Sequence, residues 1–114
     1  MTDDVVTESI QRIHNMIEAF RSNFLKLAND PEGAYVQIKF FNERVPIITQ
    51  LIEKLRIIAS PFQRERLDII TRHIIGAKII AQEVITECKG QEKCYEKVGQ
   101  LAAIKHELEL AKAA

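Results

Sequence analysis

The two cysteines, Cys88 and Cys94, are the residues of this sequence whose chemistry depends most on their surroundings. They flank the segment Lys89-Gly90-Gln91, which is typical of a helix end followed by a turn. Both thiols can then face inward across a helical hairpin, where a disulfide would attach the last helix to the rest of the protein. Two reduced, buried thiols are the alternative. The spacing is not that of a C-x-x-C redox motif, and two thiolates leave a tetrahedral zinc site half filled.

The three histidines fall on different predicted helices: His14, His73 and His106. A carboxylate-bridged di-iron bundle needs a glutamate three residues before a histidine on two helices. Here those positions hold other residues, namely Gln11, Ile70 and Ala103. We therefore expect neither a metal centre nor another cofactor. His73 lies within an apolar arc, so a shielded, hydrogen-bonded histidine is the simplest interpretation of it.

Positive charge gathers around the expected turn between the second and third helices. The residues are Lys54, Arg56, Arg64, Arg66 and Arg72, with His73 beside them. Such a patch could contact phosphates, with Phe62 as a side chain on which a base could stack. Glu65 and Asp68 lie in the same segment, so a solvated surface that neutralises its own charge is the alternative, and we favour it.

Arg66 and His73 are separated by six residues. This pattern resembles the R-x(4–6)-H motif of HEPN ribonucleases, which are small all-helical domains. The resemblance implies a dimer that cleaves RNA with Arg66 and His73 beside the scissile phosphate. The chain departs from the family pattern in having Leu67 where Asn often follows the arginine. The sequence contains no Gly-rich phosphate loop, nucleophile elbow or carboxylate cluster, which favours a non-catalytic protein.

Apolar residues recur at alternating spacings of three and four along four segments, which predicts amphipathic helices. We expect these helices at about 4–28, 34–59, 61–88 and 92–112. Ser60 and Pro61 mark the start of the third helix as N-cap and first helical residue. Pro46 lacks an N–H and predicts that the second helix is kinked or broken there. Short connections favour antiparallel neighbours, so the predicted fold is all-α, with one up-down-up-down four-helix bundle over residues 1–114.

The composition is that of a globular protein, with 46% hydrophobic and 28% charged residues and no net charge. A neutral chain has no overall field that would attract nucleic acid or an anionic membrane. The acidic N-terminal residues lack the features of a signal peptide, and every apolar run is too short to cross a bilayer. We therefore expect a soluble, cytoplasmic protein with no membrane partner.

Isoleucine is about twice as frequent as leucine, and it occurs repeatedly as Ile-Ile pairs. Glutamate, lysine and arginine are abundant, whereas glycine and methionine are few. Such a composition is typical of proteins that work at high temperature. It predicts a thermophilic source, an archaeon or an archaeal virus.

The strongest functional indication is apolar surface beyond what the predicted core needs. The second helix carries an additional stripe of Phe40, Ile47, Leu51 and Ile58, and the third helix carries Ile75 and Ile79 on an otherwise polar face. A contiguous exposed apolar patch usually marks an association surface. We predict a non-catalytic binding or assembly module that forms a homodimer or larger oligomer through the second and third helices. A wider core contact within a monomer is the alternative.

Overall fold

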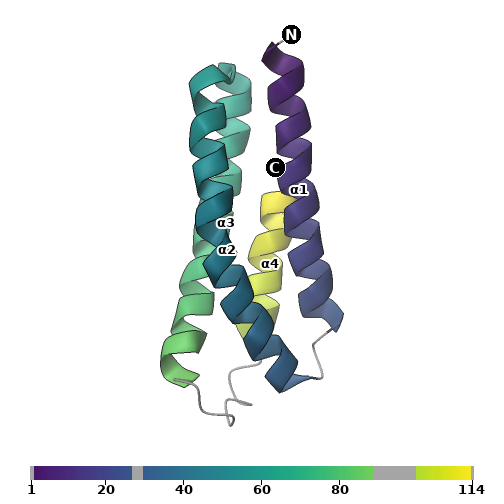
Figure 1. The fold of residues 1–114 in the computed structure, drawn as a ribbon, viewed down its shortest axis with the longest axis vertical. Helices are drawn as coiled ribbons and strands as arrows, with labels where there is room; N and C mark the ends of the chain where they lie inside the picture. The colour runs from purple at the N-terminus through teal and green to yellow at the C-terminus, as the bar shows by residue number, and fades with distance from the viewer. Residues whose placement is uncertain (1, 27–29, 89–99, 114) are drawn as a thin grey trace.

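The computed structural model describes residues 2–26, 30–88 and 100–113, and these form four helices that lie side by side (Figure 1). The helices are α1 (Thr2–Lys26), α2 (Pro31–Ile58), α3 (Pro61–Cys88) and α4 (Gln100–Ala113). The described ranges contain no strand. The predicted all-helical class and the four helices are therefore confirmed.

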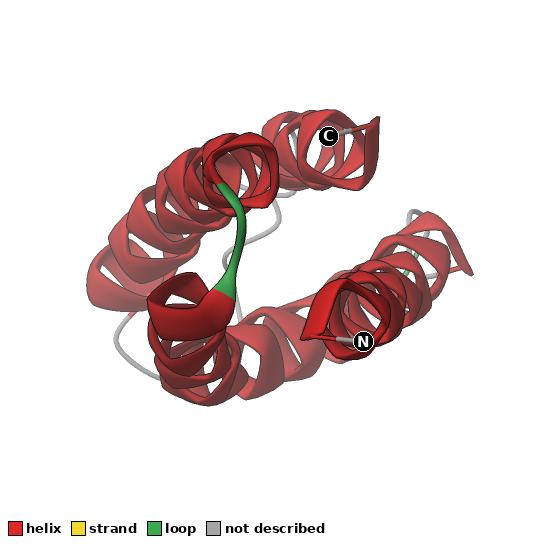
Figure 2. Ribbon diagram, turned by 90° about the horizontal axis from the view of Figure 1, so that it is seen from above, coloured by secondary structure: helices red, strands yellow, loops and turns green. Residues whose placement is uncertain are grey.

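The helices form a ring in which each packs on two neighbours (Figure 2). α3 packs most extensively on α4 and α2, and α1 completes the ring by packing on α4 and α2. With 14 residues, α4 is about half as long as the other three helices, and it lies beside only part of α1 and α3 (Figure 1). The described part of α4 therefore does not cover the remaining length of α1 and α3.

The core consists of the side chains that the alternating spacing predicted. On α1 these include Val6, Ile10, Ile13 and Ile17, each no more than 1% exposed. Phe20 and Phe24 of α1 meet Phe41 of α2 edge to face, with ring centroids 5.1 and 5.9 Å apart. Aromatic pairs favour this geometry. Ile104, Leu108 and Ala111 of α4 are fully buried, so α4 contributes to the same core.

Capping side chains determine where two of the helices begin. Asp30 accepts a hydrogen bond from the Gly33 N–H at 3.1 Å, and Pro31 occupies the first turn, so α2 begins three residues earlier than predicted. At α3, Ser60 Oγ accepts from the Gln63 N–H at 3.3 Å while Gln63 Oε1 accepts from the Ser60 N–H at 2.9 Å. This reciprocal pair is a capping box, and it confirms the predicted start of α3.

Pro46 lies inside α2, which is continuous from Pro31 to Ile58. The sequence predicted a kink or a break at this proline, and the continuous helix excludes the break. Proline at this position removes the hydrogen bond that would run to the Asn42 carbonyl. Packing on both neighbouring helices compensates for this loss, because Val45 and Ile48 on either side of the proline are buried in the core.

The predicted disulfide falls outside what the structure describes. Cys88 is the last residue of α3, its side chain is not among those described, and Cys94 lies in the undescribed range 89–99. The predicted start of the last helix near residue 92 lies in the same range. Both therefore stay predictions.

Candidate functional site

A groove runs along the outer face of α2 and α3, between two side-chain bridges. At one end Arg56 Nε lies 3.0 Å from Asp68 Oδ1. One turn beyond the other end, where Pro46 and Lys78 line the groove, Asn42 Nδ2 donates a hydrogen bond to Gln82 Oε1 at 3.1 Å. The two bridges are fourteen residues apart on each helix, which corresponds to roughly 21 Å of helix. They also show that α2 and α3 run in opposite directions and fix the register between them.

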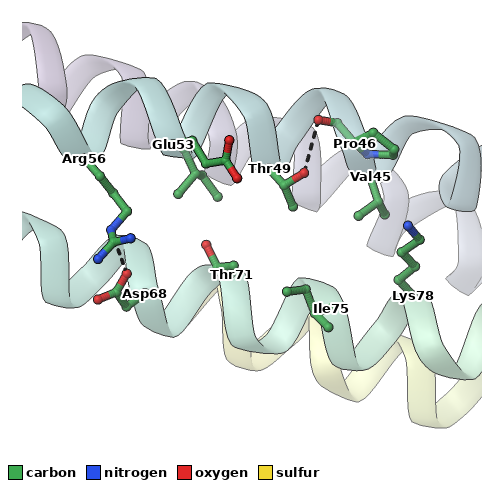
Figure 3. Close-up of a pocket in the computed structure, with 10 residues that line it drawn as sticks. Val45, Pro46, Thr49, Glu53, Arg56, Asp68, Thr71, Ile75 and Lys78 are labelled. Carbon is green, nitrogen blue, oxygen red and sulfur yellow. Dashed lines mark hydrogen bonds and ion pairs between the residues drawn. The ribbon is translucent and has the colours of Figure 1, made fainter.

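The groove has a volume of about 390 Å³ and a largely apolar floor (Figure 3). Val45 and Ile52 form the buried part of this floor, and Ile75 stands in its middle with 44% of its surface exposed. The hydroxyls of two threonines are satisfied by their own helices. Thr49 Oγ1 donates to the Pro46 carbonyl at 3.1 Å, and Thr71 Oγ1 donates to the carbonyl one turn earlier at 2.8 Å.

Two charged residues of the groove have no partner in the part of the chain that the structure describes. Glu53 and Lys78 form no hydrogen bond or ion pair with any other residue that the structure describes. Figure 3 shows them on opposite sides of Ile75 along the groove. The groove therefore combines an apolar centre with one unpaired charge of each sign.

The structure divides the six predicted interface residues between two strips. Ile75 lines the groove, and Ile79 follows it one turn later with 56% of its surface exposed. The stripe on α2 lies along the opposite edge of that helix, toward α1, because the Phe40 ring packs 5.9 Å from that of Phe20. Ile47 and Ile58 share this edge by helical spacing and are about half exposed, and Leu51 packs partly against the core. The six side chains therefore do not form one patch.

Most of the residues that line the groove with Ile75 were not predicted as site residues from the sequence. On α2 these are Pro46, Thr49 and Glu53, and on α3 Thr71 and Lys78. A signal for them is present. Residues 42, 46, 49, 53 and 56 follow one another at spacings of three and four, as do residues 68, 71, 75, 78 and 82, so each set forms one edge of its helix.

The structure does not gather the residues of the predicted basic cluster into one positively charged surface. Arg56 is paired with Asp68, and Arg64 Nε donates to the Arg56 carbonyl at 2.9 Å near the end of α2. Arg56, Arg64 and Arg72 line a pocket of about 520 Å³, but the carboxylates of Glu65 and Asp68 line it too. Lys54 is exposed on α2.

His73 is engaged by α4 and not by the arginines. Its Nδ1 lies 2.7 Å from Glu107 Oε2, and this contact joins α3 to α4. Gly76, one turn further along α3, makes room for the carboxylate, because a Cβ at this position would lie 3.3 Å from Glu107 Cδ. The prediction of a shielded, hydrogen-bonded histidine agrees with this geometry.

The charge of Arg66 acts on His14 of α1. Burial is the main cause that lowers the pKa of His14 on α1, and the charges of Arg66 and Lys112 lower it further. His14 Nε2 is buried and has no hydrogen-bond partner among the residues that the structure describes. The two residues of the HEPN-like pattern therefore have different surroundings: Arg66 acts on α1, whereas His73 binds α4.

Comparison of the chain with protein-family models, curated proteins and solved structures gave no match. Within the described ranges, no group of three His, Cys, Asp or Glu residues is placed to hold a metal ion. None of the described helices combines the length and the apolar character that crossing a membrane requires. The α2–α3 groove is therefore the feature of this structure that best indicates a function.

Proposed function

We propose that this protein is a non-catalytic assembly module that forms a homodimer through the groove between α2 and α3. In this proposal the chain is an antiparallel, up-down-up-down bundle with α2 kinked at Pro46. The observation that carries the proposal is the exposure of Ile75 and Ile79 beside a groove with an apolar floor. Complete burial of one such side chain contributes about 1.5–3 kcal/mol, so a partner on this face has a substantial driving force.

A second copy of the chain is the partner that best fits this surface. Most soluble oligomers are closed and symmetric, and a twofold interface uses the same patch on both subunits. The threonine hydroxyls of the groove are already bonded to their own helices. They can therefore be covered by a partner without loss of a hydrogen bond.

The rival proposal is a small nucleic-acid-binding protein, in its sharpest form a HEPN-like ribonuclease that uses Arg66 and His73. The pocket lined by Arg56, Arg64 and Arg72 supports it, since guanidinium groups bind phosphates in pairs of hydrogen bonds. The contacts of Arg56 with Asp68 and of His73 with Glu107 weigh against it. Phosphate or RNA would have to compete with these internal carboxylates.

Light scattering tests the assembly proposal. We expect the protein to have twice the 13.1 kDa mass of one chain, and we expect the double variant Ile75→Glu, Ile79→Glu to have the mass of one chain. Four buried carboxylates in the dimer would oppose association, whereas the monomer keeps them exposed. The matched control is Ile47→Glu, Ile58→Glu, which changes equally exposed residues on the other edge of α2 and should remain dimeric.

Circular dichroism must show the same helix content for all three proteins. A monomeric parent protein, or a dimer that survives the Ile75 and Ile79 substitutions, contradicts the proposal. The same measurement with a generic RNA at low and high salt tests the rival. A complex that dissociates at high salt, and that Arg64→Ala with Arg72→Ala weakens, would favour nucleic-acid binding.

A further inference from the structure

The two bridges between α2 and α3 are spaced equally on either side of the middle of the groove. Thr49 lies seven residues from each bridge on α2, that is, from Asn42 and from Arg56. Ile75 likewise lies seven residues from Asp68 and from Gln82 on α3. Thr49 and Ile75 therefore lie opposite each other at the midpoint of the groove.

The two unpaired charges lie on either side of this midpoint. In the register that the bridges fix, Lys78 lies opposite Pro46, whereas Glu53 lies opposite Thr71. Seven residues of α2 separate these two levels, which is roughly 10 Å along the groove. The distance is too long for an ion pair within one chain, and the midpoint between the levels falls at Thr49 (Figure 3).

We propose that two copies of the chain dock groove to groove, with Lys78 of each protomer paired with Glu53 of the partner subunit. The twofold axis crosses the groove at right angles to the helices, at the level of Thr49 and Ile75. Rotation about this axis exchanges the two ends of the groove and brings each lysine to the level of a glutamate. This inference rests on the proposed function and adds the orientation of the partner.

Charge determines this orientation. A twofold axis along the helices would keep the two levels unchanged, so Lys78 and the partner's Glu53 would stay roughly 10 Å apart along the groove. The antiparallel arrangement pairs them twice and places Ile75 at the centre, where the second copy removes it from water. It also places the Arg56–Asp68 ion pair of one protomer against the partner's hydrogen bond between the amide side chains of the other bridge. Ionic groups of one protomer therefore meet hydrogen-bonding groups of the other.

Charge reversal tests the pairing. Glu53→Lys and Lys78→Glu each place two like-charged contacts in the interface. We expect each variant to raise the dimer dissociation constant by a factor of roughly ten or more, measured by sedimentation equilibrium at low salt. An equimolar mixture of the two variants should form a heterodimer in which both pairs are restored, with an affinity near that of the parent protein. A variant that is merely misfolded would not be rescued by mixing.

Exposed charges of α1 serve as controls, since Glu8→Lys and Arg12→Glu change the net charge equally outside the groove. They should leave the dissociation constant unchanged. If the parent protein is a dimer and the groove reversals do not weaken it, or if mixing does not restore the dimer, the pairing is wrong while the assembly function stands. If the parent protein is a monomer, the assembly function itself is wrong.

Discussion

Glu18 on α1 shows how strongly the surroundings of a single residue can change its chemistry. Arg21 donates two hydrogen bonds to this carboxylate, at 2.8 and 2.7 Å, and Lys112 of α4 donates a third at 2.9 Å. The bonds from Arg21 first, and then the bond from Lys112, lower the pKa of Glu18 to about 2. Since Lys112 belongs to another helix, the carboxylate also links α1 to α4.

This link makes stability depend on pH in a defined direction. The unfolded chain has the ordinary pKa of 4.5, so the folded state binds fewer protons and the stabilisation is complete above pH 4.5. It is lost as the pH falls toward 2. We expect Glu18→Gln to lower the melting temperature above pH 4.5 and to have a much smaller effect near pH 2, measured by circular dichroism. An equal effect at both pH values would contradict this account.

At the scale of elements, the contact between α3 and α4 depends on the lack of a side chain at Gly76. Gly76 allows the Glu107 carboxylate to approach α3 closely enough to reach His73. Glycine inside a helix is unfavourable by about 1 kcal/mol relative to alanine. The close approach of α4 to α3 therefore favours glycine at position 76, whereas helix propensity favours alanine there.

A double-mutant cycle measures this conflict. In the parent protein Gly76→Ala should stabilise by clearly less than about 1 kcal/mol, because the new Cβ would lie 3.3 Å from Glu107 Cδ and displace the carboxylate from His73. In a Glu107→Ala background the same substitution should give the full gain of about 1 kcal/mol. Urea unfolding provides both free energies. Equal gains in the two backgrounds would show that Glu107 does not need the space at Gly76.

At the scale of the whole molecule, the proposed dimer couples folding to association. The bundle alone leaves one apolar strip on each of two neighbouring helices exposed, and the described part of α4 lies beside only part of α1 and α3 (Figure 1). A partner that binds only the folded chain stabilises it by mass action. The stability of this protein should therefore depend on its own concentration.

Calorimetry over a hundredfold range of protein concentration tests this coupling. We expect the melting temperature of the parent protein to rise with concentration, because unfolding then includes dissociation. The melting temperature of Ile75→Glu, Ile79→Glu should not depend on concentration. A parent protein with a constant melting temperature would indicate that the folded chain is stable without a partner.

The sequence by itself determined the class of fold, the number of helices and most of the core. Spacings of three and four place side chains on one face of a helix whatever surrounds it, so the buried positions from Val6 to Phe24 and from Ile38 to Leu55 could be predicted. The start of α3 was equally predictable, because the capping box of Ser60 and Gln63 involves only neighbouring residues.

Only the tertiary structure decided which edges of the helices meet. Sequence spacing gives the angle of a side chain around its own helix, but the direction from which the next helix approaches depends on packing. For this reason the six predicted interface residues separate into two strips, with Phe40 toward α1 and Ile75 in the α2–α3 groove. For the same reason the partner of His73, Glu107, lies 34 residues away in the chain. Packing on both sides also keeps α2 unbroken at Pro46, where local sequence preference allowed a break.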